Sequence, residues 1–115
     1  MNVECTQGKG YQLVSCRGIL GRSADGPFLD AIYPMFEEEG TKVLIDLSGV
    51  EWINSEGIAV LVRLVTKART QSCHLVLAAP NAFVDEVLKK KQLDRFFEIA
   101  STRQQAIEIL LTDDA

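Results

Sequence analysis

The sequence has few of the residues on which catalytic and metal sites are usually built. It contains one histidine, His74, and three widely separated cysteines, Cys5, Cys16 and Cys73, without a CxxC pair. Disulfide frameworks and zinc sites need paired or regularly spaced ligands, so neither is predicted. We expect small buried residues at the cysteine positions, a structural role for His74 at the start of an apolar run, and no metal or cofactor.

Long apolar runs and an excess of basic residues are also missing. Without a run of about eighteen apolar residues or a signal-peptide pattern, we expect a cytoplasmic protein that is not inserted in a membrane. Twelve basic against sixteen acidic side chains give a net charge of -4, and the longest basic run is the three lysines at 89–91. Nucleic acids and anionic membranes normally need a broader basic patch, so neither is predicted as a partner. These lysines are interpreted as cations near a helix C-terminus.

The remaining composition is typical of one small folded domain. The 115 residues are 47% hydrophobic and 24% charged, which argues against a largely disordered chain. A chain of this length can form one hydrophobic core but is too short for two ordinary domains. We therefore expect a single domain over residues 1–115, with its core at about 3–111 and a frayed tail at 112–115.

The first part of the sequence alternates between strand and helix patterns. A strand at 11–16 follows turn residues at 8–10 and could form a hairpin with residues 3–6. Gly18 and Gly21 are predicted to end this strand.

A helix is predicted from Pro27 to Gly40, because apolar residues recur there at helical spacing. Pro34 should kink or shorten this helix. The apolar run at 43–47 is short and rich in branched residues, which favours a central strand covered by helices.

Residues 48–57 are interpreted as a loop that leads into a helix ending near residue 70. Trp52 lies in this loop. We expect its ring to pack over the sheet edge or the helix as part of the core, with direct partner contact as the alternative.

The second part continues the alternation. A strand is predicted at 75–79, and Asn81 should cap the next helix. A short edge strand near 98–100 precedes a capping-box pattern at 101–104. The last helix should direct four apolar side chains inward: Ala106, Ile107, Leu110 and Leu111. This order predicts an α/β fold in which a mixed sheet of about four to five strands packs with about four helices.

Short polar residues mark the start of the helix after Trp52. Asn54 and Ser55 can each accept a hydrogen bond from a free first-turn amide, and Glu56 is favoured there by the helix dipole. Alone, this pattern predicts a helix start, where a capping serine is usually structural. The helix that follows has more apolar residues than one buried stripe needs. Either it is wedged between the sheet and neighbouring helices, or a partner covers its first two turns.

The segments 43–50 and 52–60 closely resemble the STAS domain of anti-sigma factor antagonists. In that family, a strand ending in Asp-Leu-Ser and a short loop lead to Asp-Ser-Ser/Thr-Gly-Leu at the head of a helix. Here Asp46-Leu-Ser48 and Asn54-Ser-Glu-Gly-Ile58 stand at those places. The resemblance extends from about residue 10 to residue 111.

The resemblance implies a bacterial regulator of transcription that is switched by phosphorylation and has no catalytic activity. An anti-sigma factor that is also a serine kinase, of the histidine-kinase-like ATPase type, would phosphorylate Ser55. A metal-dependent serine phosphatase would reverse this. The unphosphorylated chain, a monomer or weak homodimer, would sequester the kinase and free a sigma factor or another target.

The resemblance also implies a partner surface centred on Ser55. Its expected residues come from the loop before the first helix and from the start of the helix at Ser55: Gly21, Arg22, Ser23, Asn54, Ser55, Glu56, Gly57, Ile58 and Val62. The chain departs from the family pattern at three positions. Gly21 and Asn54 stand where aspartate is usual, and Glu56 replaces a serine or threonine.

Two other functions compete with this interpretation. A STAS subunit without a phosphorylation cycle, similar to accessory subunits of lipid-transport ATPases or to stressosome-like scaffolds, is compatible with Asn54 and Glu56. A hydrolase with Ser55 as nucleophile would need a base and an oxyanion site. The surroundings of Ser55 do not form a Gly-x-Ser-x-Gly elbow, and only His74 could serve as a histidine base, so this second function is not predicted.

Overall fold

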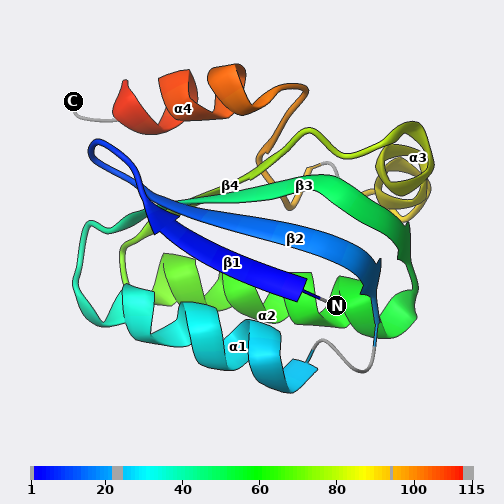
Figure 1. Cartoon of the computed structure of the whole chain (residues 1–115), viewed down its shortest axis with the longest axis horizontal. Coiled ribbons are helices and arrows are strands. Elements are labelled where there is room, and N and C mark those ends of the chain that lie inside the picture. Colours follow the sequence, from blue (N-terminus) through cyan, green and yellow to red (C-terminus); the bar gives the residue numbers. More distant parts are fainter. Residues whose placement is uncertain (1, 22–24, 94, 113–115) are drawn as a thin grey trace.

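The computed structural model describes residues 2–21, 25–93 and 95–112. Within these residues, five strands, four α-helices and one 3₁₀-helix follow each other (Figure 1). In order, they are β1 (Asn2–Gln7), β2 (Gln12–Leu20), α1 (Asp25–Ile32), the 3₁₀-helix η2 (Tyr33–Glu37), β3 (Lys42–Ile53), α2 (Ser55–Thr70), β4 (His74–Ala78), α3 (Ala82–Lys90), β5 (Ile99–Ala100) and α4 (Arg103–Leu111).

The strands form one mixed sheet in the order β1-β2-β3-β4-β5. β1 and β2 form the predicted antiparallel hairpin, with Val3 opposite Cys16. The other neighbouring strands are parallel. This sheet and its helices confirm the predicted α/β fold class. Because β2 and β3 are parallel, the segments that follow Leu20 and Ile53 leave the sheet at the same edge.

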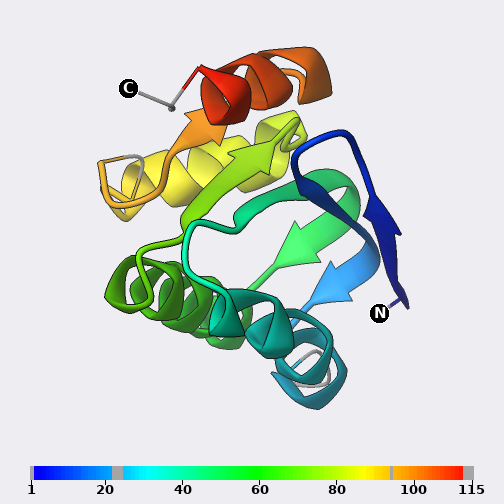
Figure 2. The same ribbon diagram turned by 90° about the vertical axis from the view of Figure 1, so that its left-hand side faces the viewer.

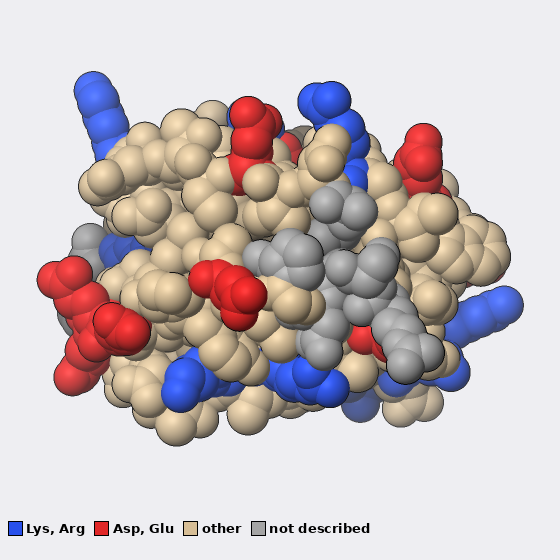
Figure 3. All heavy atoms as spheres, turned by 60° about the horizontal axis from the view of Figure 1, so that its bottom comes forward, with Lys and Arg blue, Asp and Glu red and all other residues tan. Residues whose placement is uncertain are grey.

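The helices cover the two faces of the sheet unequally. α1 and α2 lie side by side on one face, and α4 lies on the other (Figures 1 and 2). α3 packs against β3. The outer side of the α1 and α2 layer carries acidic and basic side chains interspersed with uncharged surface (Figure 3).

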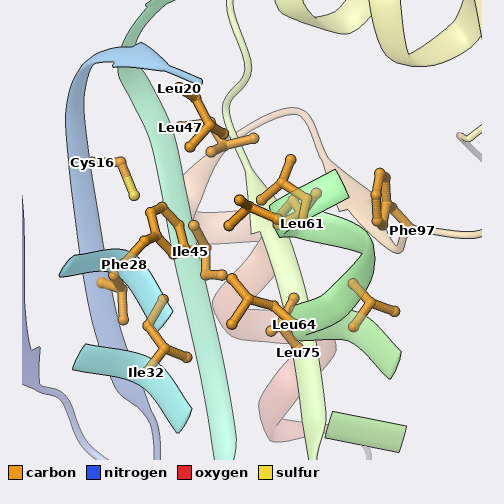
Figure 4. Close-up of a cluster of buried hydrophobic side chains, with 14 of the residues drawn as sticks. Cys16, Leu20, Phe28, Ile32, Ile45, Leu47, Leu61, Leu64, Leu75 and Phe97 are labelled. Carbon is orange, nitrogen blue, oxygen red and sulfur yellow. The ribbon is translucent and has the colours of Figure 1, made fainter. Parts of the chain in front are cut away.

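The main core lies between the sheet and the α1 and α2 layer. Phe28 and Ile32 of α1 face Ile45 of β3 and Leu61 of α2 there (Figure 4). A smaller cluster under α4 includes Leu44, which belongs to β3 but faces the opposite side. β3 is therefore covered on both faces, which confirms the prediction of a central strand and explains its continuous apolar run.

Most of the apolar side chains of α2 are buried inside the protein. Its buried residues recur at spacings of three and four: Gly57, Val60, Leu61, Leu64, Val65 and Ala68. Ile58 and Val62 flank this stripe and are partly buried against the same core. The wedged position of the helix thus accounts for most of these residues. In the described part of the chain, no helix is both long enough and apolar enough to cross a membrane.

Two strands are longer than the sequence predicted. β2 does not end at Gly18, which adopts a positive φ of 106° beside a shift in the ladder with β3. β3 continues through residues 48–53, which were predicted to be loop, because two register shifts against β2 accommodate its extra residues. Bulges of this kind re-aim the side chains that follow them. The connection between β3 and α2 is reduced to Asn54.

Pro34 shortens the first helix as predicted. α1 ends at Ile32, and Pro34 lies in the first turn of η2. Proline has no N–H to donate and its ring clashes with the preceding turn, so a regular α-helix does not continue through it.

The later helix starts are set by side-chain caps. Asn81 caps α3 as predicted, with its Oδ1 accepting a hydrogen bond from Val84 N at 2.7 Å. The last helix begins one residue later than predicted, because Thr102 is its cap and accepts a hydrogen bond from Gln105 N at 3.1 Å. Leu111, predicted to point inward, is exposed near the end of this helix. The predicted tail beyond Thr112 lies outside the described residues.

Candidate functional site

Asn54 connects the end of β3 to the start of α2. Its Oδ1 accepts a hydrogen bond from Gly57 N at 3.0 Å, and its carbonyl accepts one from Ile58 N at 2.9 Å. Its own N–H donates to the carbonyl oxygen of Leu20 at 3.3 Å. Asn54 is therefore the N-cap of α2 and also ties this helix start to the end of β2.

Ser55 is the first residue of α2 and is exposed. Its hydroxyl makes no hydrogen bond with any residue that the structure describes. The sequence allowed either Asn54 or Ser55 to cap the helix, and the structure assigns the cap to Asn54 alone. The structural role that a serine most often has at a helix start is thus already filled, and the Ser55 hydroxyl remains accessible to a partner.

Gly57 allows α2 to begin directly against β2. A Cβ atom at this position would lie 2.7 Å from the carbonyl carbon of Leu20 and 3.1 Å from Cγ1 of Ile53. Such distances are shorter than ordinary van der Waals contacts, so only glycine fits without a shift of the backbone. Gly57 is buried, and its missing side chain lets the first turn of α2, which begins at Ser55, pack closely against the end of β2.

Gly21 lies against the cap. A Cβ atom on Gly21 would be 2.8 Å from Nδ2 and 3.3 Å from Cγ of Asn54. Gly21 and Asn54, two of the three residues that depart from the family pattern, are therefore in contact. The absence of a side chain at position 21 leaves room for the Asn54 amide. Arg22 and Ser23, the predicted site residues that follow Gly21, lie outside the described residues.

The other predicted site residues surround this turn to different degrees. Glu56 is exposed beside Ser55, whereas Ile58 and Val62 are half-buried. The structure thus brings together Gly21, Asn54, Ser55 and Gly57 at one corner of the sheet. Partner contact by Ile58 and Val62 stays a prediction.

The prediction that Trp52 packs in the core is wrong. Its side chain is 50% exposed and stacks on Phe83 of α3, with ring centroids 4.5 Å apart and an interplanar angle of 20°. Ile19 of β2 is opposite Trp52 in the ladder and is also exposed. The register shift just before this pair directs Trp52 away from the main core. Alternation along β2 was a signal that could have found Ile19, because it precedes the buried Leu20.

The face of the sheet toward α4 holds a partly buried ion pair. Oδ2 of Asp46 accepts hydrogen bonds from Arg103, including one from Nε at 3.1 Å, and Oδ1 accepts one from Ser48 N at 2.9 Å. Burial alone raises the pKa of Asp46, but the hydrogen bonds from Arg103 and Ser48 and the charge of Arg103 outweigh it and lower that pKa overall. The pair joins α4 to β3.

A polar cavity of about 530 Å³ opens beside this pair, with Cys16 and Arg17 in its lining. Burial, followed by the nearby charge of Asp46 and by Cys5, raises the pKa of the Cys16 thiol to about 12. The thiol is therefore protonated at neutral pH and is a poor nucleophile. Of the three cysteines, only Cys16 is buried as predicted; Cys5 is exposed and Cys73 is half-buried.

His74, the single histidine, contacts an acidic side chain rather than Ser55 in the described part of the chain. Nε2 of His74 lies within hydrogen-bond distance of Oε1 of Glu98. Within residues 2–21, 25–93 and 95–112, no group of three or more His, Cys, Asp and Glu side chains is arranged to hold a metal ion. The turn at residues 54–57 is the site at which the sequence motif and the geometry coincide.

Known proteins resemble this chain over most of its length. The sequence profile of the STAS domain matches residues 19–106. A candidate anti-sigma factor antagonist from Thermotoga neapolitana is 32% identical over 78 residues, which cover 67% of this chain and 69% of that protein.

Two solved structures show the same fold. A candidate anti-sigma factor antagonist from Thermotoga maritima has a TM-score of 0.85 at 22% identity, covering 94% of this chain and 93% of that chain. The anti-sigma factor antagonist SpoIIAA in its unphosphorylated form has a TM-score of 0.78 at 15% identity, covering 99% and 100%. The region matched by the family profile contains the turn at 54–57 and the two strand ends that position it. This chain therefore belongs to the STAS domain family.

Proposed function

We propose that this chain is an anti-sigma factor antagonist that is switched by phosphorylation of Ser55. In its unphosphorylated form it sequesters an anti-sigma factor that is also a serine kinase of the histidine-kinase-like ATPase type. A metal-dependent serine phosphatase restores this form. The observation that carries the proposal is that Ser55 is exposed at the start of α2 while Asn54 performs the capping.

The fold can accommodate a phosphate at this position. In the transfer, the γ-phosphoryl group of ATP moves to Oγ of Ser55, the hydroxyl proton passes to a base of the kinase, and ADP leaves. The product carries about -1.5 to -2 charges at the N-terminus of a 16-residue helix, where backbone amides and the helix dipole favour an anion. Asn54 continues to bind Gly57 N, so the helix start does not depend on the modified hydroxyl.

The complex with the kinase cannot accommodate that phosphate equally well. For transfer to occur, the nucleotide phosphates of the kinase must lie next to Oγ of Ser55. A phosphate on Ser55 then meets negative charge on the partner, and the exposed Glu56 adds to the repulsion. Burying such a charge without a counter-ion is costly. Phosphorylation therefore releases the kinase without a large change in the fold of this chain.

A second function is favoured by one observation. Gly21 and Asn54, which stand where aspartate is usual, lie against each other next to Ser55. If the phosphorylation cycle needs those carboxylates, the chain is instead a STAS scaffold or an accessory subunit of a transport or stressosome-like complex. The two functions differ in whether Ser55 receives phosphate.

The decisive experiment combines phosphate transfer with binding. The purified chain is incubated with ATP and the histidine-kinase-like ATPase encoded in its own genome, and the Ser55 peptide is analysed by mass spectrometry. We expect phosphate on Ser55 in the parent and in Thr66→Ala, a control that removes another exposed residue of α2. Ser55→Ala should remain unphosphorylated and stay bound in the presence of ATP.

Ser55→Asp should fold as well as the parent but bind the kinase at least about tenfold more weakly, a loss of roughly 1.4 kcal/mol. An unmodified Ser55 peptide, together with equal affinity of the parent and the Asp variant, would exclude the switch and leave the scaffold function.

A further inference from the structure

Exposed apolar side chains are concentrated beside the turn at 54–57. In the described part of the chain, four large hydrophobic residues are exposed, and three of them lie together: Ile19 (55%), Trp52 (50%) and Phe83 (39%). Ile19 is opposite Trp52 in the β2–β3 ladder, and Trp52 stacks on Phe83 at the start of α3. We call these three residues the apolar strip. The fourth exposed residue, Leu111, belongs to α4.

The apolar strip is continuous with the candidate switch. Trp52 precedes Asn54, the cap of α2, by two residues. Ile19 precedes Leu20, whose carbonyl oxygen accepts the Asn54 N–H at 3.3 Å. The strip and the turn are therefore attached to the same pair of strand ends, and a protein that reaches Ser55 passes close to the strip.

Two acidic side chains lie beside the strip, against one basic side chain, Arg17 of β2. Glu51 is next to Trp52, and Glu86 follows Phe83 by three residues, which places it on the same side of α3. Both are exposed, and neither forms an ion pair with another described residue. If a second copy of this chain covered the strip across a two-fold axis, it would bring a second set of the same carboxylates to the interface. A partner with basic side chains around an apolar centre fits the strip better.

We propose that the apolar strip is the constant docking surface for the protein that Ser55 controls, and that this protein presents apolar side chains flanked by lysine or arginine. The inference rests on the proposed function. Aromatic residues at the centre of an interface commonly supply much of its affinity. The strip therefore contributes to the affinity for the kinase whether or not Ser55 is phosphorylated. The charge on Ser55 decides whether the contacts around residues 54–57 also form.

The first test removes apolar surface with a matched control. Ile19→Thr and Phe83→Ala are titrated against the purified histidine-kinase-like ATPase from the same genome, with thermal melts to verify folding. Each should weaken binding at least about tenfold. Leu111→Ala removes an apolar side chain of intermediate exposure (42%, against 55% for Ile19 and 39% for Phe83) from α4 and should bind as the parent does. Parent-like affinity of both strip variants would overturn the proposal.

The second test reverses charge. Glu86→Lys should weaken binding and lessen its dependence on salt, because it places like charge opposite the basic rim of the partner. Glu108→Lys makes the same change at an exposed position of α4 and should have no effect. Equal effects of the two variants would show that only net charge matters and would contradict the predicted partner chemistry.

The third test uses the single tryptophan of the chain. Because Trp52 is half-exposed, its fluorescence should shift to shorter wavelength and become less accessible to acrylamide when the kinase binds. The same titration with Trp52→Phe gives the contribution of the kinase, which is subtracted. An unchanged Trp52 signal at saturation would place the interface elsewhere.

These measurements test separately whether the apolar strip is the docking surface and whether Ser55 is switched by phosphorylation. If Ser55 is phosphorylated and released while the strip variants bind normally, the strip is wrong and the proposed function stands. If binding requires the strip but Ser55 takes no phosphate, the docking surface stands and the switch is wrong. Sedimentation that shows a dimer of this chain, dissociated by Ile19→Thr and Phe83→Ala, would assign the strip to a second copy and overturn the proposed partner.

Discussion

The backbone of Leu20 lies directly against Gly57, so that a Cβ atom at position 57 would be 2.7 Å from the Leu20 carbonyl carbon. The same carbonyl group accepts the hydrogen bond from Asn54 N. The carbonyl group of Leu20 thus contacts both Asn54, which precedes Ser55, and Gly57, which follows it. The position of the candidate phosphorylation site is determined by a strand that is more than thirty residues away in sequence.

Replacing Gly57 should disturb this contact. Gly57→Ala is expected to lower the free energy of unfolding by about 1–3 kcal/mol, because the new methyl group must displace the Leu20 backbone. Gly26→Ala is the control, since Gly26 lies in α1 with nothing within 4 Å of a new Cβ, and it should stabilise the protein by about 0.5–1 kcal/mol. Denaturant titration measures both changes. Equal effects of the two substitutions would show that the contact with Leu20 does not constrain position 57.

Asn54 and Ser55 should differ in their contribution to stability. Asn54→Ala removes the cap of α2 and is expected to cost about 1 kcal/mol. Ser55→Ala removes an exposed hydroxyl that does not cap the helix and should change stability by no more than about 0.5 kcal/mol. Thermal or chemical unfolding of the two single variants distinguishes them. A larger cost for Ser55→Ala would contradict the assignment of the cap.

Trp52 should matter less for stability than a core tryptophan. Because half of its side chain is exposed, we expect Trp52→Ala to cost about 1–2 kcal/mol, compared with about 3–5 kcal/mol for a fully buried ring. In a double-mutant cycle with Phe83→Ala, the stacked pair should show a coupling energy of about 0.5–1.5 kcal/mol. Strictly additive effects on unfolding would mean that the stacking does not stabilise the fold.

The Asp46 ion pair should produce a specific dependence of stability on pH. The pKa of Asp46 in the folded protein is lowered, so its carboxylate stabilises the fold above the ordinary value of about 3.9, and this contribution is lost as the pH falls through the lower folded pKa.

Asp46→Asn is therefore expected to cost about 1–2 kcal/mol at pH 7, because Arg103 is half-exposed and the pair is partly screened. Below about pH 4, the free energy of unfolding should fall less steeply in the variant than in the parent, because the variant has no carboxylate at position 46 to protonate. Unfolding curves at pH 3, 5 and 7 would measure this, with Glu108→Gln as an exposed carboxylate control. Parallel pH profiles for the parent and Asp46→Asn would contradict the assignment.

Local signals in the sequence were sufficient wherever the physical cause is itself local. Pro34 ends α1 because its ring and missing N–H act on the adjacent turn. Asn81 caps α3 because its side chain reaches an amide only three residues away. The alternation of strand and helix patterns likewise predicted the α/β fold, whereas a functional role for the motif at 54–57 stays a prediction.

The sequence by itself determined the order of elements, the apolar faces and the serine at the start of α2. Only the tertiary structure decided how far β3 continues, that Asn54 rather than Ser55 caps α2, and that Trp52 faces outward. Those outcomes depend on the register between β3 and β2, where two shifts change the direction of the side chains that follow. Register is set by pairing between segments far apart in the chain, so the local pattern around Trp52 could not reveal it.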